Sequence, residues 1–191
     1  MIIGITGGTG CGKTTMLDMI REMGGLVLDC DAIYHRLLQT DDALLRRIAD
    51  RFPGTVSGGV LDRKALGNIV FSDPAALMEL SGITHRAVKK EVIRALEAAP
   101  PLAAIDAIGL FESGLDRLCD TTVAITASRE QRITRLMLRD GISRKYAEKR
   151  IDAQRDPSEF AALCAHHLEN NGTEAEFRKK CLSFFRNLAI I

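Results

Sequence analysis

The chain has 191 residues, of which 46% are hydrophobic and 27% are charged. This length and composition support one domain with a sizeable core, with or without an insertion, and exclude a disordered tail. Lysine and arginine number 26 against 25 acidic residues, so the formal net charge of +1 gives no general reason to expect nucleic acid or a membrane as a partner. Any anion binding must therefore be local.

The sequence has the features of a cytoplasmic protein. It shows no basic leader, no apolar signal segment and no apolar stretch of the ~18 residues needed to cross a bilayer. The five cysteines are odd in number and lack the paired spacing of a zinc site, so we expect reduced thiols. No obligate protein partner is evident from the sequence.

A strand, a glycine-rich loop and a helix are expected at the start of the chain. Residues 1–5 are apolar and β-branched, which predicts a buried strand, and residues 14–23 carry apolar side chains at helical spacing. The loop between them, residues 7–14, reads Gly-Gly-Thr-Gly-Cys-Gly-Lys-Thr and has the spacing of a phosphate-binding loop. Its glycines allow successive N–H groups to point inward, and the helix N-terminus adds partial positive charge.

The side chains of this loop predict the binding of a nucleotide with magnesium. Lys13 is expected to reach the β- and γ-phosphates, and the Thr14 hydroxyl is expected to ligate Mg²⁺. Cys11 stands where the motif tolerates any residue, so its side chain is expected to point away from the phosphates. The alternative, a glycine-rich turn with an incidental lysine, is disfavoured by the strand before the loop and the helix after it.

Two aspartates follow the second expected strand. Residues 26–28 form a short buried run, and a helix is expected over 32–38. Ligands of open parallel α/β sheets lie beyond the carboxyl ends of the strands, which places Asp29 and Asp31 near the phosphates. In an extended segment these two side chains face the same side. Either one alone is as well suited to capping the helix as to chemistry.

Residues 41–99 have a helical pattern with no convincing strand. A crossover between parallel strands needs only about a dozen residues, so this length predicts an inserted substrate-binding module. On pattern alone, its polar residues Arg63 and His85 fit surface or capping roles better than function, and His35, on the same helical face as Asp31, fits a structural role. The expected apolar faces are Leu44, Leu45, Ile48 and Phe52; Leu66, Ile69, Val70 and Phe71; and Val88, Val92, Ile93 and Leu96.

Three more strands are expected in the second half of the chain, at 102–106, 121–126 and, more weakly, 166–168. The first of them ends in Asp106, the arrangement of a magnesium-supporting aspartate in phosphate-loop enzymes. A capping box at Thr173 then opens the C-terminal helix.

Two helices are expected between the last two strands, one opened by a capping box at Ser128 and the other starting at Ser143, and together they form a basic segment. From Arg132 to Arg155 the sequence has eight basic and three acidic residues, a local surplus of five. Arg135 and Arg139 are four apart and share a helix face, as a mobile lid closing on a triphosphate requires. A solvated basic helix is the alternative. The nucleotide site demands counter-charge, which favours a lid over 132–155.

Taken in order, these motifs resemble the dephospho-coenzyme A kinase family. The resemblance implies an α/β, three-layer phosphate-loop kinase fold with a five-stranded parallel sheet, an inserted helical substrate domain and a helical lid. The implied domains are a nucleotide-binding core (1–40, 100–131 and 156–191), a substrate-binding insertion (41–99) and a lid (132–155). The motifs are Gly-Ile-Thr-Gly-Gly-Thr-Gly-Cys-Gly-Lys-Thr at 4–14, Asp29-Cys30-Asp31 with His35, Leu61-Asp62-Arg63, Thr84-His85, Leu110-Phe111-Glu112-Ser113-Gly114-Leu115, Arg135-Leu136 with Arg139-Asp140-Gly141, Arg150-Ile151 with Gln154, and Asn170-Asn171-Gly172.

The same resemblance implies a reaction and the residues that perform it. The γ-phosphoryl group of ATP is transferred, with Mg²⁺, to the ribose 3′-hydroxyl of dephospho-coenzyme A (dephospho-CoA), the last step of coenzyme A synthesis. The implied catalytic residues are Lys13, Asp31, Arg135 and Arg139, with Asp31 as the base. The implied ATP-binding residues are Gly8, Gly10, Cys11, Gly12, Lys13, Thr14 and Thr15; the acceptor-binding residues are Asp31, His35, Arg63 and His85; and the metal ligands are Thr14 and Asp106.

Two other functions stay open on the residues alone. A phosphate-loop kinase acting on another small alcohol keeps the loop, the base and the lid and changes only the acceptor pocket. A nucleotide-dependent switch is suggested by Asp106 and Gly109, which match the Asp-x-x-Gly of GTPases. The chain has no Asn-Lys-x-Asp segment to bind guanine, which disfavours the switch.

Overall fold

The computed structural model of the chain describes residues 1–190. The chain divides into two compact units, one formed by Met1–Leu28 with the segment from Ala99 onward, and one formed by Asp29–Ala98. None of the described helices is both long and apolar enough to span a membrane.

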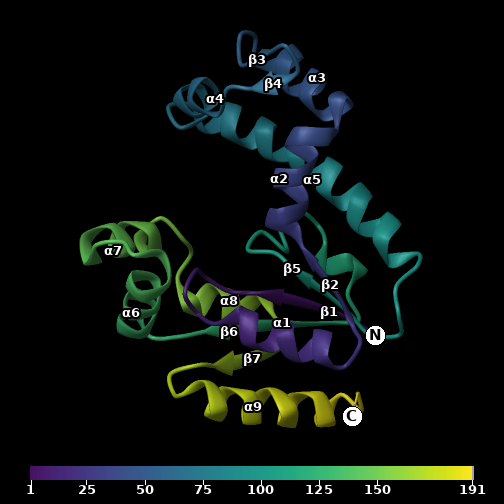
Figure 1. Cartoon of the computed structure of the whole chain (residues 1–191), viewed down its shortest axis with the longest axis vertical. Coiled ribbons are helices and arrows are strands. Elements are labelled where there is room, and N and C mark those ends of the chain that lie inside the picture. Colours follow the sequence, from purple (N-terminus) through teal and green to yellow (C-terminus); the bar gives the residue numbers. More distant parts are fainter. Residues whose placement is uncertain (191) are drawn as a thin grey trace. The chain divides into compact units, whose positions relative to one another are not determined.

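A five-stranded sheet forms the centre of the first unit (Figure 1). Its strands are β1 (Ile2–Thr6), β2 (Leu26–Asp29), β5 (Ala103–Asp106), β6 (Thr121–Thr126) and β7 (His166–Glu169). They lie in the order β2-β5-β1-β6-β7, and Ile3 of β1 pairs in parallel with Ala104 of β5 and Thr121 of β6. The predicted α/β fold with five parallel strands is confirmed. Because parallel strands end at one edge of a sheet, the segments that follow them gather at that edge.

Two helices cover this sheet with apolar side chains. Helices α1 (Lys13–Glu22) and α9 (Glu174–Asn187) pack against the sheet and against each other. Helix α9 begins at the predicted capping box, in which the Thr173 hydroxyl accepts the Glu176 N–H and the Glu176 carboxylate accepts the Thr173 N–H. Side chains in this core with no solvent exposure include Ile3, Ile5, Met16, Ile20, Ile125 and Phe185.

A second helical pair follows β6. Helices α6 (Arg129–Asp140) and α7 (Arg144–Asp152) begin at the predicted positions, after Ser128 and Ser143, whose hydroxyls each accept a backbone N–H of the first turn. They share a small apolar cluster made of Ile133, Leu136, Ala147 and Ile151. The remaining helices of the first unit are the 3₁₀ helix η1 (Asp116–Leu118) and α8 (Pro157–Leu163), which packs against β6.

The second unit is mostly helical. Helices α2 (Cys30–Thr40), α3 (Asp42–Arg51) and α4 (Arg63–Val70) all pack against α5 (Pro74–Leu96). The side chains of Asp41, Asp62 and Asp73 accept N–H groups at the starts of α3, α4 and α5. The expected core at 1–40 includes α2, which the contacts assign to the second unit. The substrate-binding role of 41–99 and the lid role of 132–155 stay predictions.

A short hairpin corrects the expectation that residues 41–99 contain no strand. Strands β3 (Val56–Ser57) and β4 (Val60–Leu61) pair in antiparallel fashion. Gly58 and Gly59 connect them with φ of +57° and +76°, the left-handed conformation that tight two-residue hairpin turns require. Each strand has only two residues, too few for an alternating pattern to be visible in the sequence.

Two of the three expected apolar faces of this unit are only partly buried. Leu66 and Val70 of α4 are buried, whereas Ile69 is 38% and Phe71 is 83% exposed, because positions 66 and 70 share a face and Phe71 lies past the helix end. Ile93 of α5 is exposed in the same way, while Val88 and Val92 are buried and Leu96 is half-buried. The first face, Leu44, Leu45, Ile48 and Phe52, is buried as predicted.

Candidate active site

The loop between β1 and α1 has the backbone conformation of an anion-binding site. Gly10 and Gly12 have φ of +76° and +91°, which L-residues rarely adopt, and a Cβ at position 12 would clash with the side-chain amide of Asn170. Gly12 is also the N-cap of α1 and supplies no side-chain cap, so the N–H groups of Lys13 and Thr14 are left for a ligand, while the Thr15 N–H donates to the Gly12 carbonyl.

Lys13 folds back over this loop. Its Nζ donates a hydrogen bond to the Gly7 carbonyl at 2.9 Å and lies 3.9 Å from Oδ1 of Asp106, at the end of β5. Both side chains are largely buried, with 14% and 15% exposed. The two strand ends therefore bring together the predicted phosphate-binding lysine and the predicted magnesium-supporting aspartate.

The other predicted loop residues differ in what they present to a ligand. Thr14 is exposed in the first turn of α1, and Thr15 is half-buried. The Cys11 side chain is 1% exposed and belongs to the core, and burial raises the pKa of its thiol. The Cys11 N–H donates to the Gly8 carbonyl at 3.3 Å, so this residue shapes the loop through its main chain.

Arg135 of α6 contacts the loop directly. Its Nη1 donates to the carbonyls of Gly10 and Cys11 at 3.3 and 3.4 Å, and its Nη2 donates to the main-chain and side-chain oxygens of Asn170 at 3.0 and 3.2 Å. Asn170, which follows β7, is 5% exposed and donates through Nδ2 to the Cys11 carbonyl at 3.0 Å. Asn170 stands in one of the motifs of the resemblance but was assigned no role there, so its contact with the loop was missed.

The loop has a second attachment to the same helical pair. Arg132 of α6 donates through Nε to the Thr9 carbonyl and through Nη2 to Oε1 of Gln154, both at 2.8 Å. The same Gln154 oxygen accepts the Thr9 N–H at 2.8 Å. Neither Arg132 nor Gln154 was predicted as a site residue. The one available signal was that Arg132 lies one helical turn before Arg135.

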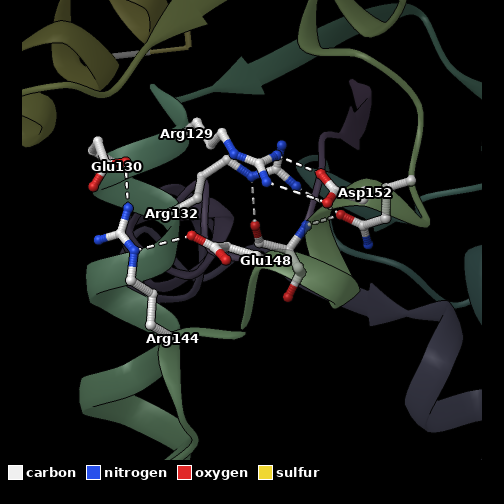
Figure 2. A network of polar contacts seen from close by, with 8 residues as sticks. Arg129, Glu130, Arg132, Arg144, Glu148 and Asp152 are labelled. Atoms are coloured by element: carbon white, nitrogen blue, oxygen red, sulfur yellow. Dashed lines mark hydrogen bonds and ion pairs between the residues drawn. The ribbon is translucent and has the colours of Figure 1, made fainter. Parts of the chain in front are cut away.

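Ion pairs join α6 to α7, as Figure 2 shows. Arg129 of α6 pairs with Asp152 of α7, and Arg144 of α7 donates to Glu130 at 2.6 Å and to Glu148 at 2.9 Å. Hydrogen bonds from Arg129 and Arg144 lower the pKa of Asp152 and Glu130, respectively. These pairs are exposed, so they add little to the stability of the protein. We attribute to them the orientation of α7 against α6.

Arg139 occupies a different environment from Arg135. Its side chain is 59% exposed, and its Nε lies 2.6 Å from Oδ1 of Asp140. Arg150 of α7 donates to the other oxygen of Asp140 at 2.6 Å. Hydrogen bonds from Arg139 and then Arg150 lower the pKa of Asp140 to about 2. Thus Arg135 contacts the loop, whereas Arg139 is held by a neighbouring carboxylate.

In the second unit the structure separates the two candidate aspartates. Asp29 is the N-cap of α2, and its Oδ1 accepts the Ala32 N–H at 2.9 Å. Because α2 begins at Cys30, Asp31 lies in its first turn, with an exposed side chain. The expectation that residues 29 and 31 lie in an extended segment and face the same side is therefore wrong. Asp29 has the capping role, and Asp31 does not.

The structure brings together two of the predicted acceptor-binding residues. Nη2 of Arg63, the first residue of α4, lies 3.3 Å from Nδ1 of His35 on α2. His85 lies half-buried on α5. Arg63 also borders a cavity of about 170 Å³, which is otherwise lined by Tyr34, Leu38, Leu61, Leu66, Gly67, Val70, Phe71 and Leu80.

A model of the dephospho-CoA kinase family (CoaE) matches residues 1–176. The chain belongs to this family. The match spans the phosphate-binding loop, both helices of the α6–α7 pair and the start of α9. It confirms the predicted family and the ATP-dependent dephospho-CoA kinase activity.

Individual proteins are similar to this chain in sequence and in fold. A dephospho-CoA kinase of Syntrophotalea carbinolica is 34% identical over 98% of this chain and 92% of its own length. The crystal structure of TT1252 from Thermus thermophilus superposes with a TM-score of 0.82, at 33% identity over 98% of this chain and 97% of that one. A dephospho-CoA kinase from Campylobacter jejuni, 24% identical over 98% of this chain and 96% of that one, has a TM-score of 0.68 and shows the same fold.

Proposed function

We propose that this chain transfers the γ-phosphoryl group of ATP, with Mg²⁺, to the ribose 3′-hydroxyl of dephospho-CoA, the last step of coenzyme A synthesis. The match of the family over residues 1–176 carries the proposal. The phosphate-binding loop supports it, because Lys13 and the uncapped start of α1 provide the positive charge that phosphoryl transfer needs.

The donor half of the site is proposed to lie in the first unit. The triphosphate binds to the predicted loop residues, with the Lys13 ammonium and the N–H groups at the start of α1 as the main donors. Arg135 holds the loop from the other side through the Gly10 and Cys11 carbonyls. Beyond Asn170 lies a cavity of about 320 Å³ that takes the nucleoside. It is lined by Glu169, Asn170, Gly172, Glu176, Phe177 and Lys180.

The magnesium ion is proposed to bind to the Thr14 hydroxyl and the Asp106 carboxylate. Both groups offer the hard oxygen donors that Mg²⁺ prefers, and Mg²⁺ commonly binds through one or two protein ligands plus substrate phosphates. When bound, the ion neutralises charge on the β- and γ-phosphate oxygens. The 3.9 Å separation of Asp106 from Lys13 supports a shared role at the same phosphates.

The acceptor half is assigned from the resemblance. Asp31 accepts the proton of the 3′-hydroxyl, and His35, Arg63 and His85 bind the acceptor. The exposed side chain of Asp31 supports this role, since Asp29 already supplies the cap of α2. The contact between Arg63 and His35 supports a common role for those two residues.

The proposal predicts a clear order of acceptors. With ATP and Mg²⁺, the protein turns over dephospho-CoA faster than adenosine or shikimate, measured by ADP release in a coupled assay. A 3′-deoxy analogue of dephospho-CoA competes for binding and accepts no phosphoryl group, because it keeps the recognised shape and lacks the nucleophile. Faster turnover of adenosine or shikimate would show that the acceptor is another alcohol.

A second prediction concerns Arg139. If 132–155 acts as a lid, Arg139→Ala lowers kcat by about 10²-fold, the effect of losing one transition-state donor. Asp140→Asn is the matched control, since it removes the carboxylate that holds Arg139 and keeps the arginine. Steady-state kinetics of both variants decide the role. Unchanged kcat in Arg139→Ala, with only solubility altered, would mean that α6 is a solvated basic helix.

A further inference from the structure

Arg132 is a buried cation whose hydrogen bonds go only to neutral groups. It is 3% exposed, and its hydrogen bonds go to the Thr9 carbonyl and the Gln154 carboxamide. Within residues 1–190, no carboxylate forms an ion pair with it. Burial lowers the pKa of its guanidinium, yet an arginine stays charged at neutral pH. Asp156 interacts with Arg132 electrostatically without forming an ion pair. A buried charge with no direct ion-pair partner is costly, and a bound anion reduces that cost.

The phosphate-binding loop packs tightly around Arg132. A Cβ at position 8 would lie 2.5 Å from Nη2 of Arg132, and a Cβ at position 10 would lie 2.9 Å from its carbonyl oxygen. Glycines at these two positions therefore allow the loop backbone to lie directly on the arginine. A shift of the guanidinium would shift the loop with it.

Gln154 closes this contact from the segment after α7. Its Oε1 accepts both the Thr9 N–H and the Arg132 Nη2–H at 2.8 Å. One carboxamide oxygen thus ties Thr9 to Arg132. Arg132 and Gln154 lie near the two ends of the segment 132–155, so both ends of that segment contact the loop.

We propose that Arg132 is a positioning residue for ATP, which fixes the first half of the phosphate-binding loop through Thr9 and Gln154 and adds a buried positive charge that attracts the bound triphosphate. This rests on the proposed function, in which the loop binds ATP. A fixed charge in a water-poor environment attracts an anion more strongly than an exposed one does. Arg132 therefore contributes to ATP binding and leaves the acceptor site unaffected.

Arg132→Met tests the proposal, because methionine fills similar space but has neither the positive charge nor the N–H donors of the guanidinium. We expect Kd and KM for ATP to rise about 10-fold or more, as charged hydrogen bonds are lost, with KM for dephospho-CoA unchanged. We expect the Tm of the ligand-free protein to stay within about 4 °C of wild type, because loss of a buried charge that has no ion-pair partner offsets the lost contacts. We expect ATP to raise the Tm of this variant by less than it raises the Tm of the wild-type protein. Arg132→Lys, which keeps the charge, restores part of the ATP affinity.

Arg129→Met is the matched control. Arg129 lies on the same helix and joins α6 to α7 through Asp152, so its loss disturbs the helical pair and leaves the Thr9 contacts in place. We expect the Kd of the Arg129→Met variant for ATP to stay near the wild-type value. If Arg132→Met does not fold, Arg132→Lys and Gln154→Leu provide the same comparison.

Two results would overturn the inference. One is an Arg132→Met variant with a much lower ligand-free Tm and an ATP affinity within about twofold of wild type, which would assign the residue to stability alone. The other is a similarly unchanged ATP affinity in both Arg132→Lys and Gln154→Leu. A wild-type protein that binds no ATP would instead contradict the proposed function.

Discussion

Lys13→Ala lowers kcat by about 10²-fold or more at saturating ATP and dephospho-CoA. Phosphoryl transfer depends mainly on positioning and on stabilisation of the charge that develops on the transferred group, and Lys13 is the point charge proposed for that task. Its ammonium is already fixed, 2.9 Å from the Gly7 carbonyl and 3.9 Å from Asp106. A charge held this way costs little reorganisation during the reaction, so its removal affects kcat strongly.

Lys179→Ala is the control for Lys13, because Lys179 is an exposed lysine of the same unit on α9. We expect its kcat to match that of wild type. Circular dichroism of both variants establishes that each is folded. A kcat for Lys13→Ala within about twofold of wild type would contradict the assigned role of the loop lysine.

Asp31→Asn keeps near-normal affinities for ATP and dephospho-CoA while turnover falls by about 10² to 10⁴-fold, the usual contribution of a general base. Asparagine retains the shape of the side chain and loses its basicity. The structure strengthens the contrast with Asp29, because Asp29 caps α2 through the Ala32 N–H. Single-turnover rates and both ligand affinities measure the two effects separately.

Asp29→Asn is the matched variant. Asparagine is as good an N-cap as aspartate, so we expect a much smaller loss of turnover and little change in stability. Asp29→Ala, which removes the cap, is expected to lower the free energy of unfolding by about 1 kcal/mol. A deeper loss of turnover in Asp29→Asn than in Asp31→Asn would reverse the assignment of the base.

Local signals explain which elements could be predicted from the sequence. Ser128, Ser143 and Thr173 marked helix starts correctly because an N-cap acts on N–H groups two or three residues away. The run over Thr121–Thr126 was predicted with its full bounds. The start of α2 was misplaced by two residues, because the sequence did not indicate which of the two aspartates caps the helix.

Long-range contacts explain what the sequence did not reveal about the site. Lys13 was predicted from the spacing of the phosphate-binding loop, and Asp106 from its place at the end of a strand of the sheet. Arg132 and Asn170 were missed as contacts of the loop. Their partners are main-chain carbonyls 123 and 159 residues away in the sequence. Every residue has such a carbonyl, so no particular residue type marks the partner in the sequence.

The most direct measurement of the central claim is the identity of the product. The full chain is incubated with ATP, Mg²⁺ and dephospho-CoA, and the mixture is followed by ³¹P NMR and mass spectrometry. We predict one new phosphomonoester on the ribose 3′-oxygen of dephospho-CoA, formed in step with ADP. Release of free phosphate with dephospho-CoA unchanged, or a phosphoryl group on any other position, would contradict the account.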